Sequence, residues 1–245
     1  QAAFGPRLSH YKVCLIDQAH TMREEAQNSL LKLLEEPPDY WLFLLVADQV
    51  EWLLPTIRSR LIELRFDPLS EKETEQVLET ITVPEDCLAD MSQDAVQERW
   101  RQQRPVLARL AGGSAGKALE WFRLDALTLR EEMLDLLEQS GRDDLLVYTS
   151  GLPWLTKNDR AEGLVLMELL LLLLRDGLFL TMGLPQPLYN KDLRQRLGLF
   201  FADWTEPQVR RAMELGEEAR QAIGSFVSRR LALEGLFLEI HQLHS

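Results

Sequence analysis

Cysteine is scarce in this chain of 245 residues, which contains only Cys14 and Cys87. The two lie far apart and form no C-x-x-C pair, so the spacing predicts neither a metal site nor a dithiol redox motif. Val13 and Leu15 flank Cys14, and Leu88 follows Cys87; we expect two buried free thiols in a reducing cytosol. We therefore expect a cytoplasmic protein without structural disulfides.

Basic residues are also in the minority. The chain carries 27 Lys and Arg against 39 Asp and Glu, and its formal net charge is −12. Affinity for phosphate backbones comes largely from clustered Lys and Arg, so this balance argues against independent binding of nucleic acid. It suits a soluble protein whose partners are basic or of mixed charge.

An uninterrupted apolar span is missing as well. The most apolar segment, residues 164–184, contains six consecutive leucines but also Glu168, Arg175 and Asp176. Such charges cost too much in the centre of a bilayer, so we expect a helix that other helices bury and no contact with a membrane. The N-terminus shows no signal peptide. Because the chain starts at Gln1 and not at Met, we expect that an upstream segment has been removed.

The first 66 residues show the pattern of an α/β unit. Apolar runs predict three strands, over residues 12–16, 41–46 and 61–66. The first two runs lack alternation, as parallel strands covered on both faces do. Between them, Thr21 with Glu24 predicts a capping box, and Pro37-Pro38 ends the helix after Glu36. Strand, helix and strand in this order predict a βαβ unit.

Beyond residue 66 the strand signals disappear and the pattern is helical. Capping residues predict helix starts at Ser70 with Glu73, at Ser114, and at Thr205 with Gln208. The expected fold class is therefore α/β plus all-α. The predicted domains are residues 1–66, 67–122 and 123–245.

The predicted strand over residues 12–16 leads into Asp17-Gln18, and this pattern has the form of a Walker B element. In such elements an aspartate holds the magnesium shell, and the next residue is normally a glutamate that orients or activates the attacking water. Here that residue is Gln18, a neutral amide that can hydrogen-bond a water but cannot take its proton. The alternative is that Asp17 only caps a turn after a buried strand.

Two further stretches are more specific. Residues 26–38 read AQNSLLKLLEEPP, and residues 54–60 read LPTIRSR. In this order after the Walker B pattern, they closely resemble bacterial DNA polymerase III clamp-loader subunits of the delta-prime type, which are AAA+ proteins. The resemblance implies that residues 1–66 are the C-terminal part of an AAA+ P-loop-type α/β domain. It likewise implies a helical lid domain over residues 67–122 and a helical collar domain over residues 123–245.

Within that family, the arginine of the Ser-Arg element is an arginine finger that acts in trans. The resemblance therefore implies that Arg60 points at the γ-phosphate of ATP in the neighbouring subunit and that Ser59 holds the local turn. A fixed guanidinium there neutralises developing charge, an effect on the order of 10³–10⁵ in rate in related phosphoryl-transfer sites. Leu61 stands where the family has a cysteine. The alternative for Arg60 is a solvated turn arginine.

Several departures favour the delta-prime type over the ATP-hydrolysing gamma/tau type. Gln18 replaces the catalytic glutamate, Ala47 stands where active relatives carry threonine, and Gly116 lies near the place of their sensor-2 arginine. A G-x-x-x-x-G-K-S/T loop is also lacking, but in this family that loop lies upstream of Walker B, so its absence weighs less. We expect no intrinsic ATPase and no cofactor bound by this chain, with ATP and magnesium bound by the neighbouring subunit.

The resemblance implies a non-catalytic subunit of the complex that loads the sliding clamp on primed DNA during DNA replication. That complex is part of the DNA-directed DNA polymerase (nucleotidyltransferase) holoenzyme. The implied partners are gamma/tau and delta subunits in a pentameric ring, and the clamp and primer-template DNA through the complex. The resemblance also implies a DNA contact at Thr21 and Arg23, at a helix start. A helix cap and a solvated arginine are the alternative for these two residues.

Two other functions stay open. One is a gamma/tau-type clamp-loader ATPase whose nucleotide site was lost with the N-terminus, and an intact P-loop upstream would favour it. The other is a helical adaptor protein that uses only its C-terminal helices. An unrelated helical core would also explain the leucines of residues 169–174.

Overall fold

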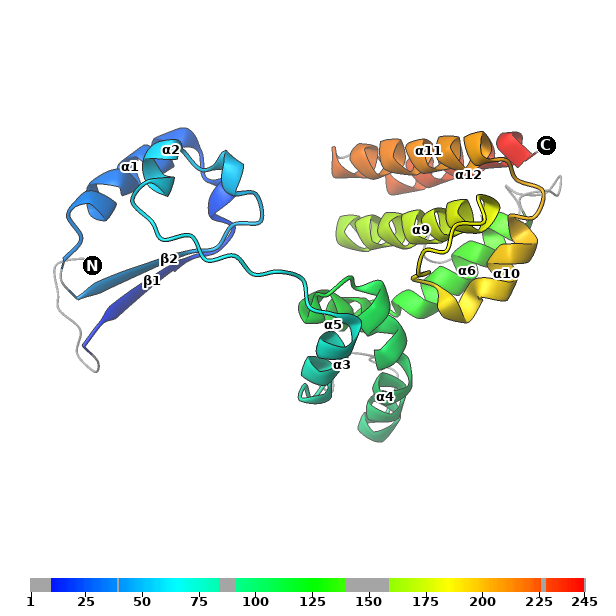
Figure 1. The fold of residues 1–245 in the computed structure, drawn as a ribbon, viewed down its shortest axis with the longest axis horizontal. Coiled ribbons are helices and arrows are strands. Elements are labelled where there is room, and N and C mark those ends of the chain that lie inside the picture. Colours follow the sequence, from blue (N-terminus) through cyan, green and yellow to red (C-terminus); the bar gives the residue numbers. More distant parts are fainter. Residues whose placement is uncertain (1–9, 39, 84–90, 140–158, 226–227, 245) are drawn as a thin grey trace. The chain divides into compact units, whose positions relative to one another are not determined.

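The computed structural model describes residues 10–38, 40–83, 91–139, 159–225 and 228–244. The chain forms two compact units, an N-terminal unit of residues 1–67 and a C-terminal unit of residues 68–245 (Figure 1). Cys14 is a partly buried free thiol, and Cys87 lies outside the described residues. The three-domain division at residues 66 and 122 stays a prediction.

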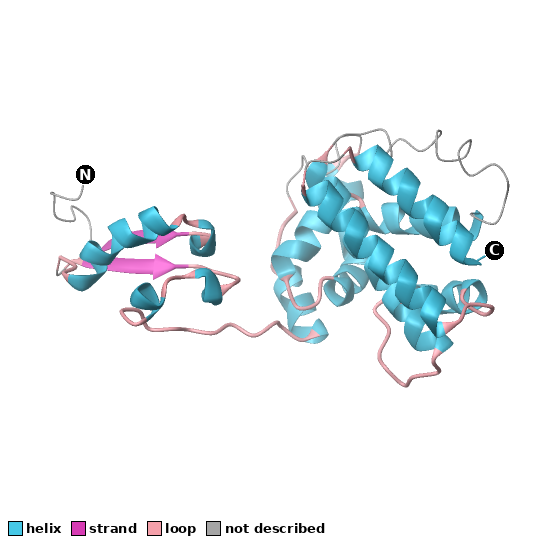
Figure 2. Ribbon diagram, turned by 90° about the horizontal axis from the view of Figure 1, so that it is seen from above, coloured by secondary structure: helices cyan, strands magenta, loops and turns pink. Residues whose placement is uncertain are grey.

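The N-terminal unit is a βαβ arrangement. Strands β1 (Lys12–Ile16) and β2 (Trp41–Leu45) pair in parallel, with Lys12 opposite Trp41 and Ile16 opposite Leu45. Helix α1 (Glu24–Glu35) connects them and ends with Glu36 as its C-cap, directly before the two prolines. Figures 1 and 2 show α1 on one side of the strand pair. The predicted helix between two parallel strands is confirmed.

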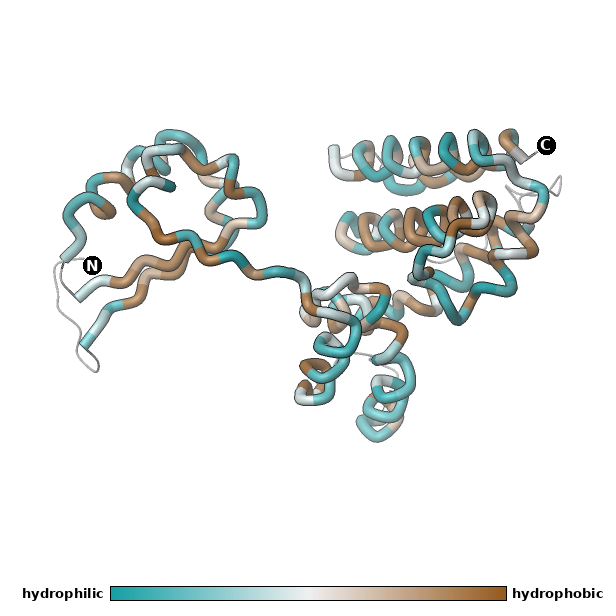
Figure 3. Tube along the Cα trace, in the orientation of Figure 1, coloured by the Kyte–Doolittle hydropathy of each residue, from teal (hydrophilic) through white to brown (hydrophobic). Residues whose placement is uncertain are grey.

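The sheet is covered on one face only within the described residues. Side chains alternate in burial along both strands, and Val13, Leu15, Leu42 and Leu44 are exposed. Figure 3 shows that both strands are hydrophobic along their length, so the exposed face is apolar too. The expected cover on the second face is therefore not met by the part of the chain that the structure describes.

The third predicted strand, over residues 61–66, is wrong. Residues 62–66 have no regular secondary structure, and Ile62, Leu64 and Phe66 are exposed. The sheet of the described residues consists of β1 and β2 alone. A strand needs a neighbour to pair its backbone N–H and C=O groups. Alternating apolar residues without such a neighbour do not make a strand.

The predicted capping box at Thr21 is also wrong. Helix α1 begins at Glu24 with Arg23 as its N-cap, and no side chain caps it. Thr21 instead ends a short 3-10 turn, η1 (Ala19–Thr21), and its hydroxyl donates to the Gln18 carbonyl at 2.9 Å. The extended backbone of Met22 then separates this turn from α1. Thr21 therefore stabilises the turn that precedes the helix.

The regular secondary structure of the C-terminal unit is entirely helical in its described residues. Its helices are α3 (Glu71–Glu79), α4 (Gln93–Leu110), α5 (Ala115–Arg123), α6 (Ala126–Gln139), α9 (Arg160–Thr181), α10 (Arg194–Phe200), α11 (Glu206–Gly224) and α12 (Arg229–His244). The predicted caps at their starts are confirmed. The Ser70 and Ser114 hydroxyls accept from backbone N–H groups at 3.2 Å, and the Thr205 N–H donates to Gln208 at 2.8 Å.

Helix α9 is the centre of the C-terminal unit, as its leucines predict. It packs against α6, α10 and α11, and it is the most continuously hydrophobic helix in Figure 3. Glu168, a partly exposed residue of α9, forms an ion pair with Lys117 of α5 at 2.7 Å. In the described part of the chain, every helix is too short or too polar to cross a membrane.

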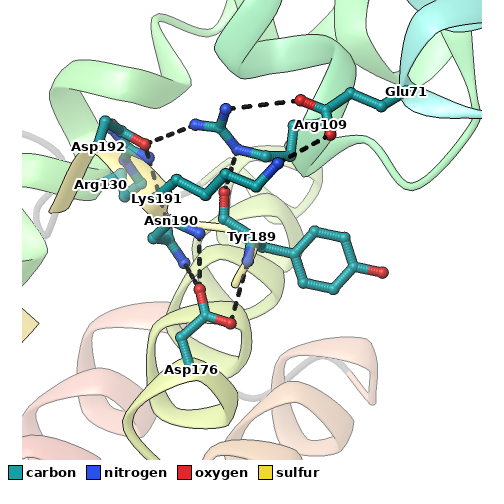
Figure 4. A network of polar contacts seen from close by, with 8 residues as sticks. All are labelled: Glu71, Arg109, Arg130, Asp176, Tyr189, Asn190, Lys191 and Asp192. Atoms are coloured by element: carbon teal, nitrogen blue, oxygen red, sulfur yellow. Dashed lines mark hydrogen bonds and ion pairs between the residues drawn. The ribbon is translucent and has the colours of Figure 1, made fainter. Parts of the chain in front are cut away.

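One polar network fastens the connection that follows α9. Asp176 on α9 is fully buried and accepts hydrogen bonds from the backbone N–H groups of Tyr189 at 3.1 Å and Asn190 at 2.6 Å. The Asn190 side chain donates to the same carboxylate at 2.9 Å. Figure 4 shows these contacts beside those of Asp192, which binds Arg109 and Arg130. Arg130 also donates to the Asn190 side chain at 3.0 Å, and Arg109 lies 3.6 Å from Glu71, so the network joins α3 to the central helix α9.

Candidate functional site

The Asp17-Gln18 pair lies in a tight turn after β1. Gln18 has a left-handed backbone (φ 49°), and its N–H donates to the Asp17 carboxylate at 2.9 Å. The Ala19 N–H then donates to the Val46 carbonyl at 2.8 Å, which ties the turn to the end of β2. The hydrogen bond from the Gln18 N–H is a local contact that holds the Asp17 carboxylate against the backbone of the turn. A role for Asp17 and Gln18 in a degenerate Walker B element stays a prediction.

No group of three or more His, Cys, Asp or Glu side chains is arranged to hold a metal ion within the described residues. Asp17 is exposed, and so is Asp48 beyond the end of β2. Carboxylates at the carboxyl ends of parallel strands are well placed for a ligand. Asp17 alone would nevertheless supply few of the oxygen ligands that magnesium prefers.

Arg60 and Ser59 lie at the end of α2 (Pro55–Arg58). The Ser59 hydroxyl donates to the Thr56 carbonyl at 3.0 Å, and the Arg60 Nη1 donates to the same carbonyl at 2.8 Å. Arg60 Nη2 forms an ion pair with Glu35 at 2.5 Å. The arginine is therefore held on the surface by the Thr56 carbonyl, the Glu35 carboxylate and the Ser59 hydroxyl of its own unit, and Ser59 also takes part in the turn. The role of Arg60 as a trans-acting arginine finger stays a prediction.

The two sets of predicted residues lie at opposite ends of α1. Asp17, Gln18 and Thr21 precede its first turn, whereas Arg60 contacts its last residue, Glu35. Twelve helical residues span about 18 Å at 1.5 Å per residue. Arg60 therefore does not lie near the carboxyl ends of β1 and β2 in its own unit, where Asp17 and Gln18 lie.

Gln27 is a residue that sequence reasoning missed. Its side chain is only 4% exposed; its Nε2 donates to the Met22 carbonyl at 3.0 Å and to the Trp52 carbonyl at 3.2 Å. Its Oε1 accepts from the Leu54 N–H at 2.8 Å. Gln27 thus fastens the start of α1 to the segment that leads into α2. The available signal was a polar residue three positions before Leu30, on the buried face of the helix.

Replacing Gln27 by methionine, which is similar in length but forms no such bonds, is expected to destabilise the N-terminal unit. Two carbonyls and one N–H would lose their partner inside the protein, and we expect the free energy of unfolding to fall by about 2–4 kcal/mol. Asn28→Met, at the exposed next position, is the matched control and should change it little. Denaturant titration measures both, and equal midpoints for the two variants would contradict this role.

Thr21 and Arg23, the predicted DNA contacts, are both exposed before the first turn of α1. Arg23 makes no side-chain hydrogen bond or ion pair within the part of the chain that the structure describes. Glu24 and Glu25 occupy the first turn, however, and their charge opposes the approach of a phosphate backbone. The DNA contact stays a prediction.

The other two positions used in the sequence argument have simple surroundings. Ala47 is partly buried directly after β2. Gly116 lies in the first turn of α5, and a Cβ built there would meet no atom within 4 Å. A larger residue would therefore fit at position 116, so the glycine is not required by packing.

Comparisons with known proteins agree with the resemblance seen in the sequence. A family described as "DNA polymerase III, delta subunit" matches residues 1–70. The DNA polymerase III subunit delta' of Bacillus subtilis is 28% identical over 239 residues, which cover 96% of this chain and 67% of that protein. The subunit gamma/tau of Mycobacterium bovis is 31% identical over 161 residues, which cover 66% of this chain.

The chain is thus similar to DNA polymerase III subunits of the delta' and gamma/tau types. It spans 24% of the length of the mycobacterial gamma/tau protein. Among solved structures, a DNA polymerase III gamma subunit-related protein from Thermotoga maritima aligns with 99% of this chain and 76% of its own. Its TM-score of 0.48 at 15% identity is too low to establish a common fold.

Proposed function

We propose that this chain acts as a non-catalytic, delta-prime-like subunit of the clamp-loader complex of DNA polymerase III. The observation that carries the proposal is the similarity to a delta' subunit along 96% of the chain. Gln18 supports the non-catalytic part, because an amide at that position cannot accept a proton from water. In this role the chain helps to load the sliding clamp on primed DNA during replication.

In the proposal, Arg60 acts in trans as an arginine finger. Its guanidinium would neutralise charge that develops on the γ-phosphate of ATP in the neighbouring subunit. The place of Arg60 at the far end of α1 from Asp17 and Gln18 supports a role outside its own strand ends. The chain itself would bind neither ATP nor magnesium, and the neighbouring subunit would bind both.

The proposed architecture follows from the same family. The N-terminal unit would be the C-terminal part of an AAA+ α/β domain, followed by a lid and a collar. The collar would join gamma/tau and delta subunits in a pentameric ring in the cytoplasm. The sliding clamp and primer-template DNA would be met through the assembled complex. The long, apolar α9 with α11 beside it supports a helical core for the collar.

A second candidate is a gamma/tau-type ATPase. The 31% identity to mycobacterial gamma/tau favours it, over 66% of this chain. Gln18 is the feature against it, since rapid hydrolysis needs a group that orients the water and accepts its proton. The helical adaptor is a third candidate, and it differs in that it would need no loader subunits as partners.

Reconstitution tests the function directly. The full protein is combined with the other loader subunits of its organism, and clamp loading on primed DNA is measured with and without it. We expect loading to require this subunit and the isolated protein to show no ATP hydrolysis above background. Loading that proceeds equally without it, or a basal ATPase that Asp17→Ala abolishes, would contradict the proposal. Asp48→Ala, at an exposed aspartate after β2, is the control for Asp17→Ala in the ATPase measurement.

A further inference from the structure

The guanidinium of Arg60 is already occupied by groups of its own chain. Its Nη2 lies 2.5 Å from the Glu35 carboxylate, and its Nη1 lies 2.8 Å from the Thr56 carbonyl and 3.4 Å from the Ser59 hydroxyl. A guanidinium grips phosphate with paired N–H groups of this kind. In this conformation Arg60 cannot offer that fork to a phosphate until Nη2 leaves Glu35.

The position of Glu35 explains why the pair forms. Glu35 is the last residue of α1, and Glu36 follows as the C-cap. The C-terminus of a helix carries partial negative charge, so carboxylates there are unfavourable and a nearby cation is favourable. Arg60 supplies that cation from the end of α2. The α1 terminus thus attracts the arginine through the Glu35 carboxylate and the partial charge of the helix end.

The pair can also open easily. The Arg60 side chain is 34% exposed and that of Glu35 is 47% exposed. When the arginine leaves, water can solvate the carboxylate, so no buried charge is left without a partner. A triphosphate carries more charge than one carboxylate and accepts two parallel hydrogen bonds, so it can displace Glu35.

We propose that Glu35 is a positioning residue that holds Arg60 against the surface of its own chain until a phosphate of the neighbouring subunit's nucleotide replaces it. This inference rests on the proposed function. When the phosphate replaces Glu35, the guanidinium stays paired with an anion, first the carboxylate and then the phosphate. An ion pair of this exposure shifts such an equilibrium by about two- to fivefold. Glu35 therefore biases the arginine towards the retracted position and does not lock it there.

The test replaces Glu35 by glutamine in the full protein within the reconstituted loader complex. We expect kcat/KM for ATP to rise about two- to fivefold, because fewer subunits start with the arginine retracted. At saturating ATP the phosphate already holds Arg60, so kcat should stay unchanged. Glu25→Gln is the matched control on α1, because Glu25 is exposed and its side chain has no hydrogen bond or ion pair within the described residues. It should change neither quantity.

A second arm separates this inference from the proposed function. Glu35→Gln is combined with Arg60→Ala, and in that background it should have no further effect on kcat/KM. The same rise in both backgrounds would show that Glu35 acts without Arg60 and would overturn the inference. If Glu35→Gln leaves kcat/KM unchanged while Arg60→Ala lowers turnover, the inference about Glu35 is wrong and the role of Arg60 as an arginine finger is supported. If Arg60→Ala does not lower turnover, Arg60 is not an arginine finger, and the inference about Glu35 is then wrong as well.

Discussion

In the role proposed for Arg60, alanine at this position is expected to remove most ATP hydrolysis at the neighbouring subunit's site, while the complex still assembles. A trans guanidinium stabilises charge that exists only in the transition state, so its loss should lower turnover at that site by on the order of 10³–10⁵. The turnover of the whole complex should fall at least by the share of that site. Assembly should persist, because the contacts of Arg60 in the described residues are with Glu35, Thr56 and Ser59 of its own unit.

The controls for this experiment lie beside Arg60. Arg58→Ala removes an exposed arginine two residues earlier, whose ion pair to Glu63 is long at 3.9 Å, and turnover should stay unchanged. Arg60→Lys keeps the charge but loses the planar fork, so it should recover only a small part of the rate. Steady-state ATPase with size-exclusion chromatography measures both effects. Unchanged turnover in an assembled Arg60→Ala complex would contradict the role of Arg60 as an arginine finger.

Much of the fold could be predicted because its signals are local. The caps at Ser70, Ser114 and Thr205 each depend on contacts within three residues, and all three helices start where the sequence predicts. Residues 61–66 failed for the opposite reason, since a strand depends on a distant neighbour that no local pattern reports. Thr21 failed because its hydroxyl bonds backward into a 3-10 turn instead of forward into α1.

The candidate site divides in the same way. Asp17, Gln18, Ser59 and Arg60 could be chosen from motif spacing, because each sits in a recognisable run of residues. The Glu35–Arg60 pair joins residues 25 positions apart, and neither partner predicts the other without the fold. Gln27 is similar, since its bonds to Trp52 and Leu54 cross between two segments. Tertiary contacts of this kind are what the sequence pattern leaves out.

The polar network at Asp176 was not predicted either, although Asp176 stood out as a charge inside an apolar helix. Arg130, which is 1% exposed, binds Asp192 through its Nη2 at 2.5 Å, and Arg109 binds the same carboxylate at 2.8 Å. Burial alone would raise the pKa of Asp192, but the hydrogen bond and charge of Arg130, aided by the charge of Arg109, hold it below its ordinary value. The network is thus a set of compensated buried charges.

Replacing Asp176 by alanine is expected to lower the free energy of unfolding of the C-terminal unit by about 3–5 kcal/mol. The carboxylate accepts from two backbone N–H groups and the Asn190 amide, and it pairs with Arg175 at 2.9 Å. Without it, three donors stay buried at the end of a loop that otherwise packs on α9. Asp203→Ala is the control, because Asp203 is exposed and its side chain has no hydrogen bond or ion pair within the described residues.

Denaturant titration followed by circular dichroism measures this difference, since the C-terminal unit supplies most of the helix in the described residues. A change under about 1 kcal/mol would mean that water reaches the Tyr189 and Asn190 N–H groups and replaces the carboxylate. Asp176→Asn distinguishes charge from hydrogen bonding. The amide keeps one acceptor oxygen in place of two and forms no ion pair with Arg175, so the stability of Asp176→Asn should fall between the wild type and alanine. That order follows if the buried carboxylate acts first as an acceptor for the loop and second as a charge.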